Sequence, residues 1–169
     1  RAELVKAGHA FVSNTDSETL IHGYEEWGEG LLDRLRGMYA FVIWDTRKKK
    51  LFGARDIFGI KPLYYAQMNG TLMFASEIKA FMEHPKFDKI FNEDALGNYL
   101  SFQFVPTNET FFKGVFCVQP GHYFTYEDGR LELTRYFEPN FTGDCRKPFK
   151  EVVDDVGAVM KESVEMHKI

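Results

Sequence analysis

Three pairs of apolar segments, each joined by a short turn, constrain the fold of this chain more than any other feature of its sequence. Two of the turns contain Asn69-Gly70 and Asp128-Gly129, residue pairs that tolerate the positive φ angles of tight hairpins. Strands joined by so few residues pair antiparallel. We therefore predict three β-hairpins, formed by residues 37–44 with 51–54, 62–66 with 72–75, and 116–126 with 131–137.

The first of these segments is apolar along nearly its whole length, from Gly37 to Trp44. Such a run is typical of a strand that is covered on both faces. A further short strand is expected over residues 9–12, after a helix over residues 1–7 that ends before Gly8.

The segment from Thr15 to Glu18 has the capping-box pattern of a helix start, a hydroxyl followed three residues later by a carboxylate. Helical spacing predicts that Leu20, Ile21, Tyr24 and Trp27 form one buried face of this helix, which ends at Gly28. Further helices are expected over residues 30–35, 76–83 and 149–168, and from Asn92, whose helix would direct Ala95, Leu96, Tyr99 and Leu100 inward.

This order of elements, with little alternation of strand, helix and parallel strand, favours an α+β sandwich in which helices cover stacked antiparallel sheets. The chain has 169 residues, of which seventeen are Phe and 44% are hydrophobic. These numbers suffice for one well-filled core and exclude a disordered chain.

Charge and composition narrow the class of protein. A formal net charge of −4 argues against a surface for nucleic acid or acidic membranes. The basic cluster at residues 47–50 lies between two apolar segments, so it is interpreted as a solvated hairpin turn. No apolar run has the length of a membrane span, no signal peptide is visible, and two cysteines are too few for a disulfide framework, which together favour a cytoplasmic protein.

Several ordered segments resemble the class II glutamine amidotransferases, and in particular the glutaminase domain of glutamine-dependent asparagine synthetases. The most specific are LRGMYAFVIWD at residues 35–45 and ARDIFGIKPLYY at residues 54–65. The resemblance extends to GHAF at 8–11, TDSE at 15–18, FASEIKA at 74–80, YLSFQFVP at 99–106 and VQPGHY at 118–123.

The resemblance implies an N-terminal-nucleophile type sandwich within an enzyme that makes asparagine from aspartate, glutamine and ATP. In that family the thiol of the first residue attacks the glutamine amide, and an Asn-Gly pair stabilises the oxyanion. Asp16 matches the carboxylate that holds the glutamine α-amino group. Read without the resemblance, Asp16 is only a first-turn acid favoured by the helix dipole.

Other parts of that machinery have no counterpart in this sequence, which begins with Arg1. The sequence contains no match for the nucleophilic cysteine or for the arginine that binds the glutamine carboxylate. Asn69-Gly70 is not the oxyanion pair, because it lies in a hairpin turn. We therefore expect an N-terminally truncated glutaminase domain over residues 1–143, inactive by itself. Residues 144–169 would be a linker and the first helix of a synthetase domain, absent from this sequence, that uses ATP and Mg²⁺.

The remaining candidate residues receive structural interpretations. Cys117 is expected to be a buried, inert thiol in a strand, and Cys145 a free thiol in a loop. The five histidines show no paired metal-ligand spacing. A charged and hydrogen-bonded network that fixes the hairpins is the preferred role for the polar groups Arg55, Asp56, Ser76 and Glu77.

Two alternative functions stay open. One is a non-catalytic binding or regulatory module on the amidotransferase scaffold, and the other is an amidotransferase that acts on a sugar phosphate or phosphoribosyl acceptor. For the chain by itself we expect self-association, because strands missing from its N-terminal side would leave sheet edges and apolar surface uncovered.

Overall fold

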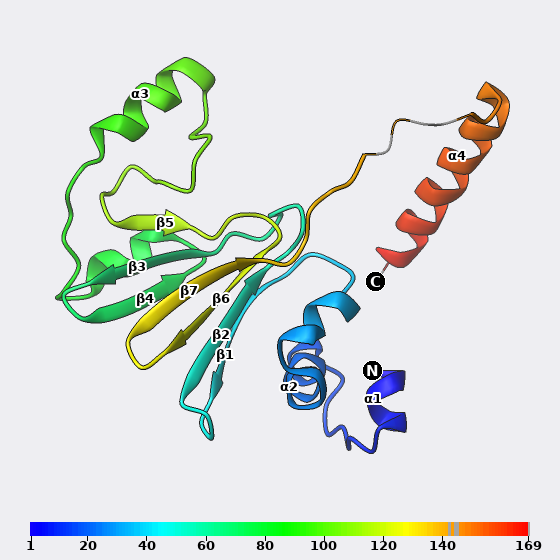
Figure 1. Cartoon of the computed structure of the whole chain (residues 1–169), viewed down its shortest axis with the longest axis horizontal. Coiled ribbons are helices and arrows are strands. Elements are labelled where there is room, and N and C mark those ends of the chain that lie inside the picture. Colours follow the sequence, from blue (N-terminus) through cyan, green and yellow to red (C-terminus); the bar gives the residue numbers. More distant parts are fainter. Residues whose placement is uncertain (142, 144–145, 169) are drawn as a thin grey trace. The chain divides into compact units, whose positions relative to one another are not determined.

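The computed structural model describes residues 1–141, 143 and 146–168, which form two compact units, residues 1–138 and 139–169. The first unit contains two antiparallel sheets (Figure 1). Its helices are α1 (Ala2–Lys6), α2 (Asp16–Trp27), α3 (Glu93–Phe102) and the 3-10 helices η1 (Gly28–Arg34) and η2 (Ile78–Glu83). Its strands are β1 (Ala40–Asp45), β2 (Lys50–Arg55), β3 (Tyr64–Met68), β4 (Thr71–Ala75), β5 (Val115–Cys117), β6 (His122–Glu127) and β7 (Arg130–Arg135).

The four-stranded sheet has the order β1-β2-β6-β7, and the three-stranded sheet has the order β4-β3-β5. The first two predicted hairpins are confirmed, with Ala40 opposite Arg55 in one and Tyr64 opposite Ala75 in the other. In the second hairpin, Asn69 and Gly70 have φ angles of 49° and 72°, as a tight turn requires.

The third predicted hairpin forms around Asp128-Gly129, with His122 opposite Arg135, but the prediction of one continuous strand over residues 116–126 is wrong. The chain leaves the three-stranded sheet after β5 and enters the four-stranded sheet at β6. Between them, Pro120 lacks an N–H for a strand ladder, and Gly121 has a φ of 66°. A Cβ at Gly121 would lie 3.0 Å from the carbonyl oxygen of Phe137, so a larger residue would strain this crossing.

Three apolar clusters arrange the first unit in layers. One cluster packs α2 and η1 on the four-stranded sheet, through Tyr24, Leu31, Leu32, Phe52 and Ala54. The second lies between the two sheets and contains Leu63, Tyr65, Val118 and Phe124. The third packs η2 on the outer face of the three-stranded sheet, through Ala66, Met73, Phe81 and Val115. The α+β sandwich of antiparallel sheets and helices is therefore confirmed.

Strand β1 is covered on both faces along most of its length, as its apolar sequence predicts. Phe41 and Ile43 pack against the α2 cluster, whereas Ala40 and Val42 pack against the cluster between the sheets. Because β1 is an edge strand, its last apolar residue leaves the core, and Trp44 is 53% exposed.

Several helical predictions hold in position but not in detail. Residues 30–35 and 76–83 contain 3-10 turns rather than α-helix. Ile21 of α2 is exposed, and of the four residues predicted to point inward from α3 only Ala95 is buried, whereas Leu96, Tyr99 and Leu100 are exposed. The buried faces of both helices are therefore narrower than predicted. Asn92 precedes α3, but its side-chain amide donates to the carbonyl oxygen of Thr110 instead of capping the helix.

The second unit contains α4 (Phe149–Met166), which confirms the amphipathic helix predicted near the C-terminal end. Its apolar stripe includes Val153, Val156, Val159, Met160 and Val164, all at least half exposed. The domain boundary after residue 143 and the self-association of the chain stay predictions. No helix among the described residues combines the length and apolar character needed to cross a membrane.

We expect Gly53→Ala to destabilise the protein by about 1–3 kcal/mol, because overpacking a closed core costs that amount. A Cβ at Gly53 would lie 2.4 Å from Cζ of Phe124, a ring with no exposed surface. Gly97→Ala, in α3 with open space around it, is the matched control and should stabilise by about 0.5–1 kcal/mol. Urea unfolding of both variants measures the difference, and equal effects of the two would contradict the packing argument.

Candidate functional site

Helix α2 presents Asp16 as its first residue. Thr15 is the N-cap, and its hydroxyl accepts a hydrogen bond from the Glu18 N–H at 3.4 Å. The Asp16 side chain is exposed, and within the described residues its carboxylate forms no hydrogen bond or ion pair. This carboxylate is therefore accessible to a cationic ligand.

The Glu18 carboxylate fixes the loop that leads into α2. It accepts hydrogen bonds from the N–H groups of Val12 at 2.6 Å and Ser13 at 2.7 Å, and from the Ser13 hydroxyl at 2.6 Å. The Ser13 hydroxyl and the Val12 N–H lower the pKa of Glu18 to about 2. The strand predicted over residues 9–12 is not formed, because the N–H of Val12 donates to this carboxylate and the N–H of His9 donates to the carbonyl oxygen of Leu4.

Two histidines approach each other beside α2. Nδ1 of His9 lies 3.2 Å from Nδ1 of His22, and Nδ1 of His22 lies 3.1 Å from Oε2 of Glu25. Both imidazole side chains are less than 20% exposed. The histidines are thirteen residues apart, so no short motif predicts the pair, but Glu18, His22 and Glu25 follow one another at helical i+4 and i+3 spacing. That spacing is the signal in the sequence that indicates this cluster.

Arg55 and Asp56 form a network at the end of β2. The Arg55 guanidinium donates to the carbonyl oxygens of Gly59 at 2.6 Å, Lys61 at 2.7 Å and Val118 at 2.6 Å. Asp56, which is 1% exposed, accepts from the N–H groups at residues 58, 60 and 61, at 3.0–3.1 Å. Burial alone would raise the pKa of Asp56, but these backbone donors outweigh it and hold the pKa below its ordinary value.

A cavity of about 580 Å³ opens on the other side of Arg55. Its lining includes Tyr64, Tyr99, Cys117, Pro120 and the segment 103–112. Nη1 of Arg55 lies 3.0 Å from Sγ of Cys117, yet burial raises the pKa of this half-buried thiol more than Arg55 lowers it. Cys117 is thus a weak nucleophile, as the sequence predicts.

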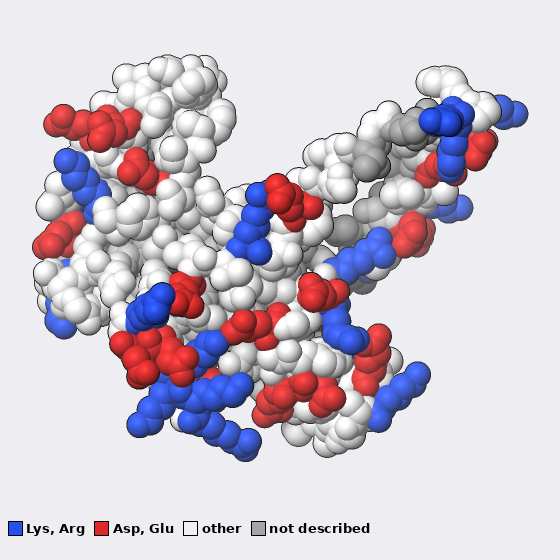
Figure 2. All heavy atoms as spheres, viewed as in Figure 1, with Lys and Arg blue, Asp and Glu red and all other residues white. Residues whose placement is uncertain are grey.

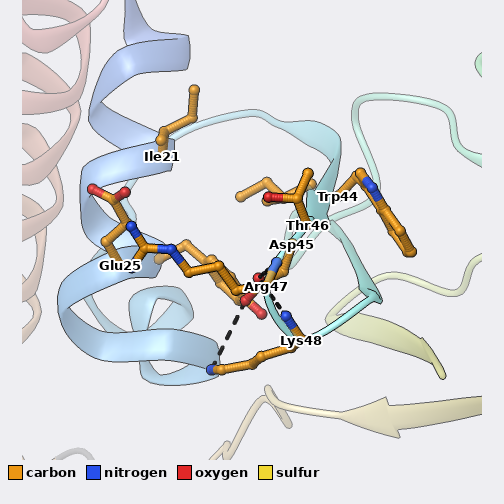
Figure 3. Close-up of a pocket in the computed structure, with 9 residues that line it drawn as sticks. Ile21, Glu25, Trp44, Asp45, Thr46, Arg47 and Lys48 are labelled. Carbon is orange, nitrogen blue, oxygen red and sulfur yellow. Dashed lines mark hydrogen bonds and ion pairs between the residues drawn. The ribbon is translucent and has the colours of Figure 1, made fainter.

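A smaller pocket of about 310 Å³ lies between α2 and the β1–β2 turn, lined in part by Ile21, Glu25, Trp44 and Lys48 (Figure 3). Figure 2 shows the Lys and Arg side chains that gather at the tip of this hairpin. Residues 47–49 are exposed, which confirms the solvated turn, whereas Lys50 pairs with Glu29 at 2.6 Å. The turn is closed by Asp45, whose carboxylate accepts from the N–H groups of residues 47 and 48.

Residues 1–137 match the family of glutamine amidotransferase domains. The chain belongs to this family. It is 40% identical to glutamine-hydrolysing asparagine synthetase 1 of Bacillus subtilis, in an alignment that covers 99% of this chain and 26% of that protein. It is 37% identical to a putative glutamine-hydrolysing asparagine synthetase of Mycobacterium bovis, covering 95% of this chain and 26% of that protein. The chain thus spans about a quarter of the length of these relatives.

Among solved structures, the glutamine amidotransferase domain is similar to the glutamine phosphoribosylpyrophosphate amidotransferase of B. subtilis complexed with ADP and GMP. The TM-score is 0.55 at 23% identity, and the similarity covers 82% of this chain and 26% of that one. This likeness supports the N-terminal-nucleophile type fold that the sequence predicts.

The structure groups only part of the polar set predicted within this amidotransferase domain. Arg55 and Asp56 form the expected network, but Glu77 pairs with the exposed Lys79 at 2.5 Å, and Ser76 forms no hydrogen bond to that network. Cys145 lies outside the described residues. The role of Asp16 in holding a substrate stays a prediction.

We expect Asp56→Asn to lower the free energy of unfolding by about 3 kcal/mol at pH 7. Oδ2 of Asp56 accepts a hydrogen bond from the N–H of Lys61, and the amide N–H₂ of Asn would place a second donor against that N–H. The pKa of Asp56 is lower in the folded protein than in the unfolded chain, so the ionised carboxylate stabilises the folded state. This stabilisation is complete above the ordinary pKa of about 3.9 and is lost as the pH falls through the lowered folded value. The difference between variant and wild type should therefore shrink below about pH 4. Urea unfolding across this pH range tests this, with the exposed Asp33→Asn as control.

Proposed function

We propose that this chain is the amidotransferase part of a glutamine-hydrolysing asparagine synthetase. The observation that carries the proposal is the identity of 36–40% to such synthetases over nearly all of the chain, in a sequence that matches a glutamine amidotransferase domain. The whole protein would release ammonia from glutamine and water, leaving glutamate. It would then use ATP to amidate aspartate, with release of AMP and pyrophosphate.

Asp16 is the residue of this chain that we assign to glutamine. Its exposed carboxylate can form a charge-assisted hydrogen bond with the α-ammonium group of the substrate. The hydrogen bonds from residues 12 and 13 to Glu18 support this role, because they fix the loop on one side of Asp16 while α2 fixes the other. Glu18 is thus a positioning residue for the proposed ligand.

The attacking thiol and the oxyanion donors are assigned to parts of the whole protein other than this chain. The raised pKa of Cys117 supports that assignment, because a protonated, half-buried thiol attacks slowly. ATP and Mg²⁺ belong to the proposed synthetase domain, and no residue of this chain is assigned to them. The free thiol of Cys117 also fits the proposed location in the cytoplasm.

In the whole protein, Asp16→Asn should raise the KM for glutamine about 10- to 100-fold, because a hydrogen bond to a charged group contributes about 1.5–3 kcal/mol. Asparagine formation from added ammonium chloride should be unchanged. Asp94→Asn is the matched control, since Asp94 is an exposed acid in the first turn of α3. An equal change in the KM for glutamine in both variants would mean that Asp16 only interacts with the helix dipole. Activity with a sugar phosphate in place of aspartate would favour the alternative acceptor.

The chain of residues 1–169 by itself should release no glutamate from glutamine, because its half-buried Cys117 is not activated. An enzyme-coupled glutamate assay over several hours provides the measurement, with the whole protein as positive control. Glutamate release by this chain that Asp16→Ala abolishes would show that it carries a complete glutaminase site.

A further inference from the structure

We propose that His9, His22 and Glu25 bind a divalent cation of the Zn²⁺ class. One ligand atom of each residue, Nδ1 of both histidines and one Glu25 carboxylate oxygen, lies within 4.8 Å of the other two, beside α2. This site is separate from the Asp16 carboxylate, and it does not depend on the proposed function.

The spacing of the three ligand atoms suits a tetrahedral ion. Nδ1 of His9 and Nδ1 of His22 are 3.2 Å apart, and Oε2 of Glu25 lies 3.1 Å from His22 and 3.9 Å from His9. In a tetrahedral zinc site, bonds of about 2.0–2.1 Å place the ligand atoms about 3.4 Å from one another. Shifts of a few tenths of an ångström would therefore bring all three into coordination.

The Glu26 carboxylate favours the tautomer of His9 that metal binding requires. Nε2 of His9 lies 3.1 Å from Oε2 of Glu26, and Nε2 of His22 lies 3.7 Å from Oε1 of Glu18. With its proton on Nε2 toward Glu26, His9 offers the Nδ1 lone pair to an ion, whereas the Nδ1 of His22 is in hydrogen-bond contact with Glu25 and would exchange that proton for the metal. A carboxylate hydrogen-bonded behind a ligating histidine, as Glu26 is behind His9, is the usual outer shell of a metal site.

The protein frame holds these ligands before any ion binds. His22 and Glu25 are three residues apart on α2, so they share one face of the helix. The N–H of His9 donates to the carbonyl oxygen of Leu4 at 3.0 Å, and Leu4 is buried, which fixes the loop after α1. The side chain of Phe11 packs edge-on against the His22 ring at a centroid distance of 4.7 Å. The 55% exposed side chain of Glu25 leaves an open side for the ion and for a water as fourth ligand.

Titration of the chelator-treated chain with Zn²⁺ by calorimetry, and with Co²⁺ by visible absorption, tests this site. We expect one ion per chain with micromolar or tighter affinity, and the intense bands of tetrahedral cobalt. Glu25→Ala should weaken binding at least 10-fold, and the outer-shell change Glu26→Gln about 10-fold. Both glutamates are on the surface, so neither substitution threatens the fold.

His22→Gln should abolish tetrahedral cobalt absorption, whereas His167→Gln, which changes an exposed histidine of α4's C-terminal end, should leave binding as in the wild type. Thermal unfolding should show a Zn²⁺-dependent rise in Tm for the wild type and the His167 variant, and no such rise for His22→Gln. The absence of saturable binding at one equivalent would overturn the proposal. Wild-type affinity in Glu25→Ala would overturn it as well.

Discussion

The Arg55–Asp56 network is the interaction on which the rest of the amidotransferase fold depends. Arg55 ends β2 in the four-stranded sheet, yet its guanidinium donates to the carbonyl oxygen of Val118, just after β5 of the other sheet. The Asp56 carbonyl accepts from the N–H of Gly121, where the chain crosses back into the first sheet. Two adjacent residues thereby fix the crossing between sheets. The buried Asp56 carboxylate and the half-buried Arg55 guanidinium are tolerated here because each charged group has several hydrogen-bond partners.

The sequence predicts those features that depend on neighbours in the chain. Asn69-Gly70 can adopt positive φ angles without help from other residues, and the hairpin around it forms as expected. The segment at residues 9–12 fails for the opposite reason, because the N–H of Val12 is taken by Glu18, a side chain on α2, and the N–H of His9 by the carbonyl oxygen of Leu4. Likewise, the path of residues 116–126 between two sheets is set by contacts with Arg55 and Asp56, which lie more than sixty residues earlier.

The candidate sites follow the same rule. Asp16 could be proposed from the sequence because it lies in a continuous segment of family resemblance, whereas the proximity of His9 and His22 results from packing of the loop after α1 onto α2. Periodicity places His22 and Glu25 on one face of a helix but contains no information about His9. Chemistry assembled from two separate segments requires the fold before it can be recognised.

Helix α2 serves the core and both candidate sites with different faces. Tyr24 packs on Phe52 with ring centroids 5.3 Å apart, which fixes the helix on the four-stranded sheet. The first residue, Asp16, remains accessible, and the polar face carries Glu18, His22 and Glu25. Because Glu18 contacts both the loop at residues 12–13 and the His22 ring, a shift of either group moves the same carboxylate. Occupancy of the histidine cluster would therefore be felt at the loop that positions Asp16, through one side chain rather than through the core.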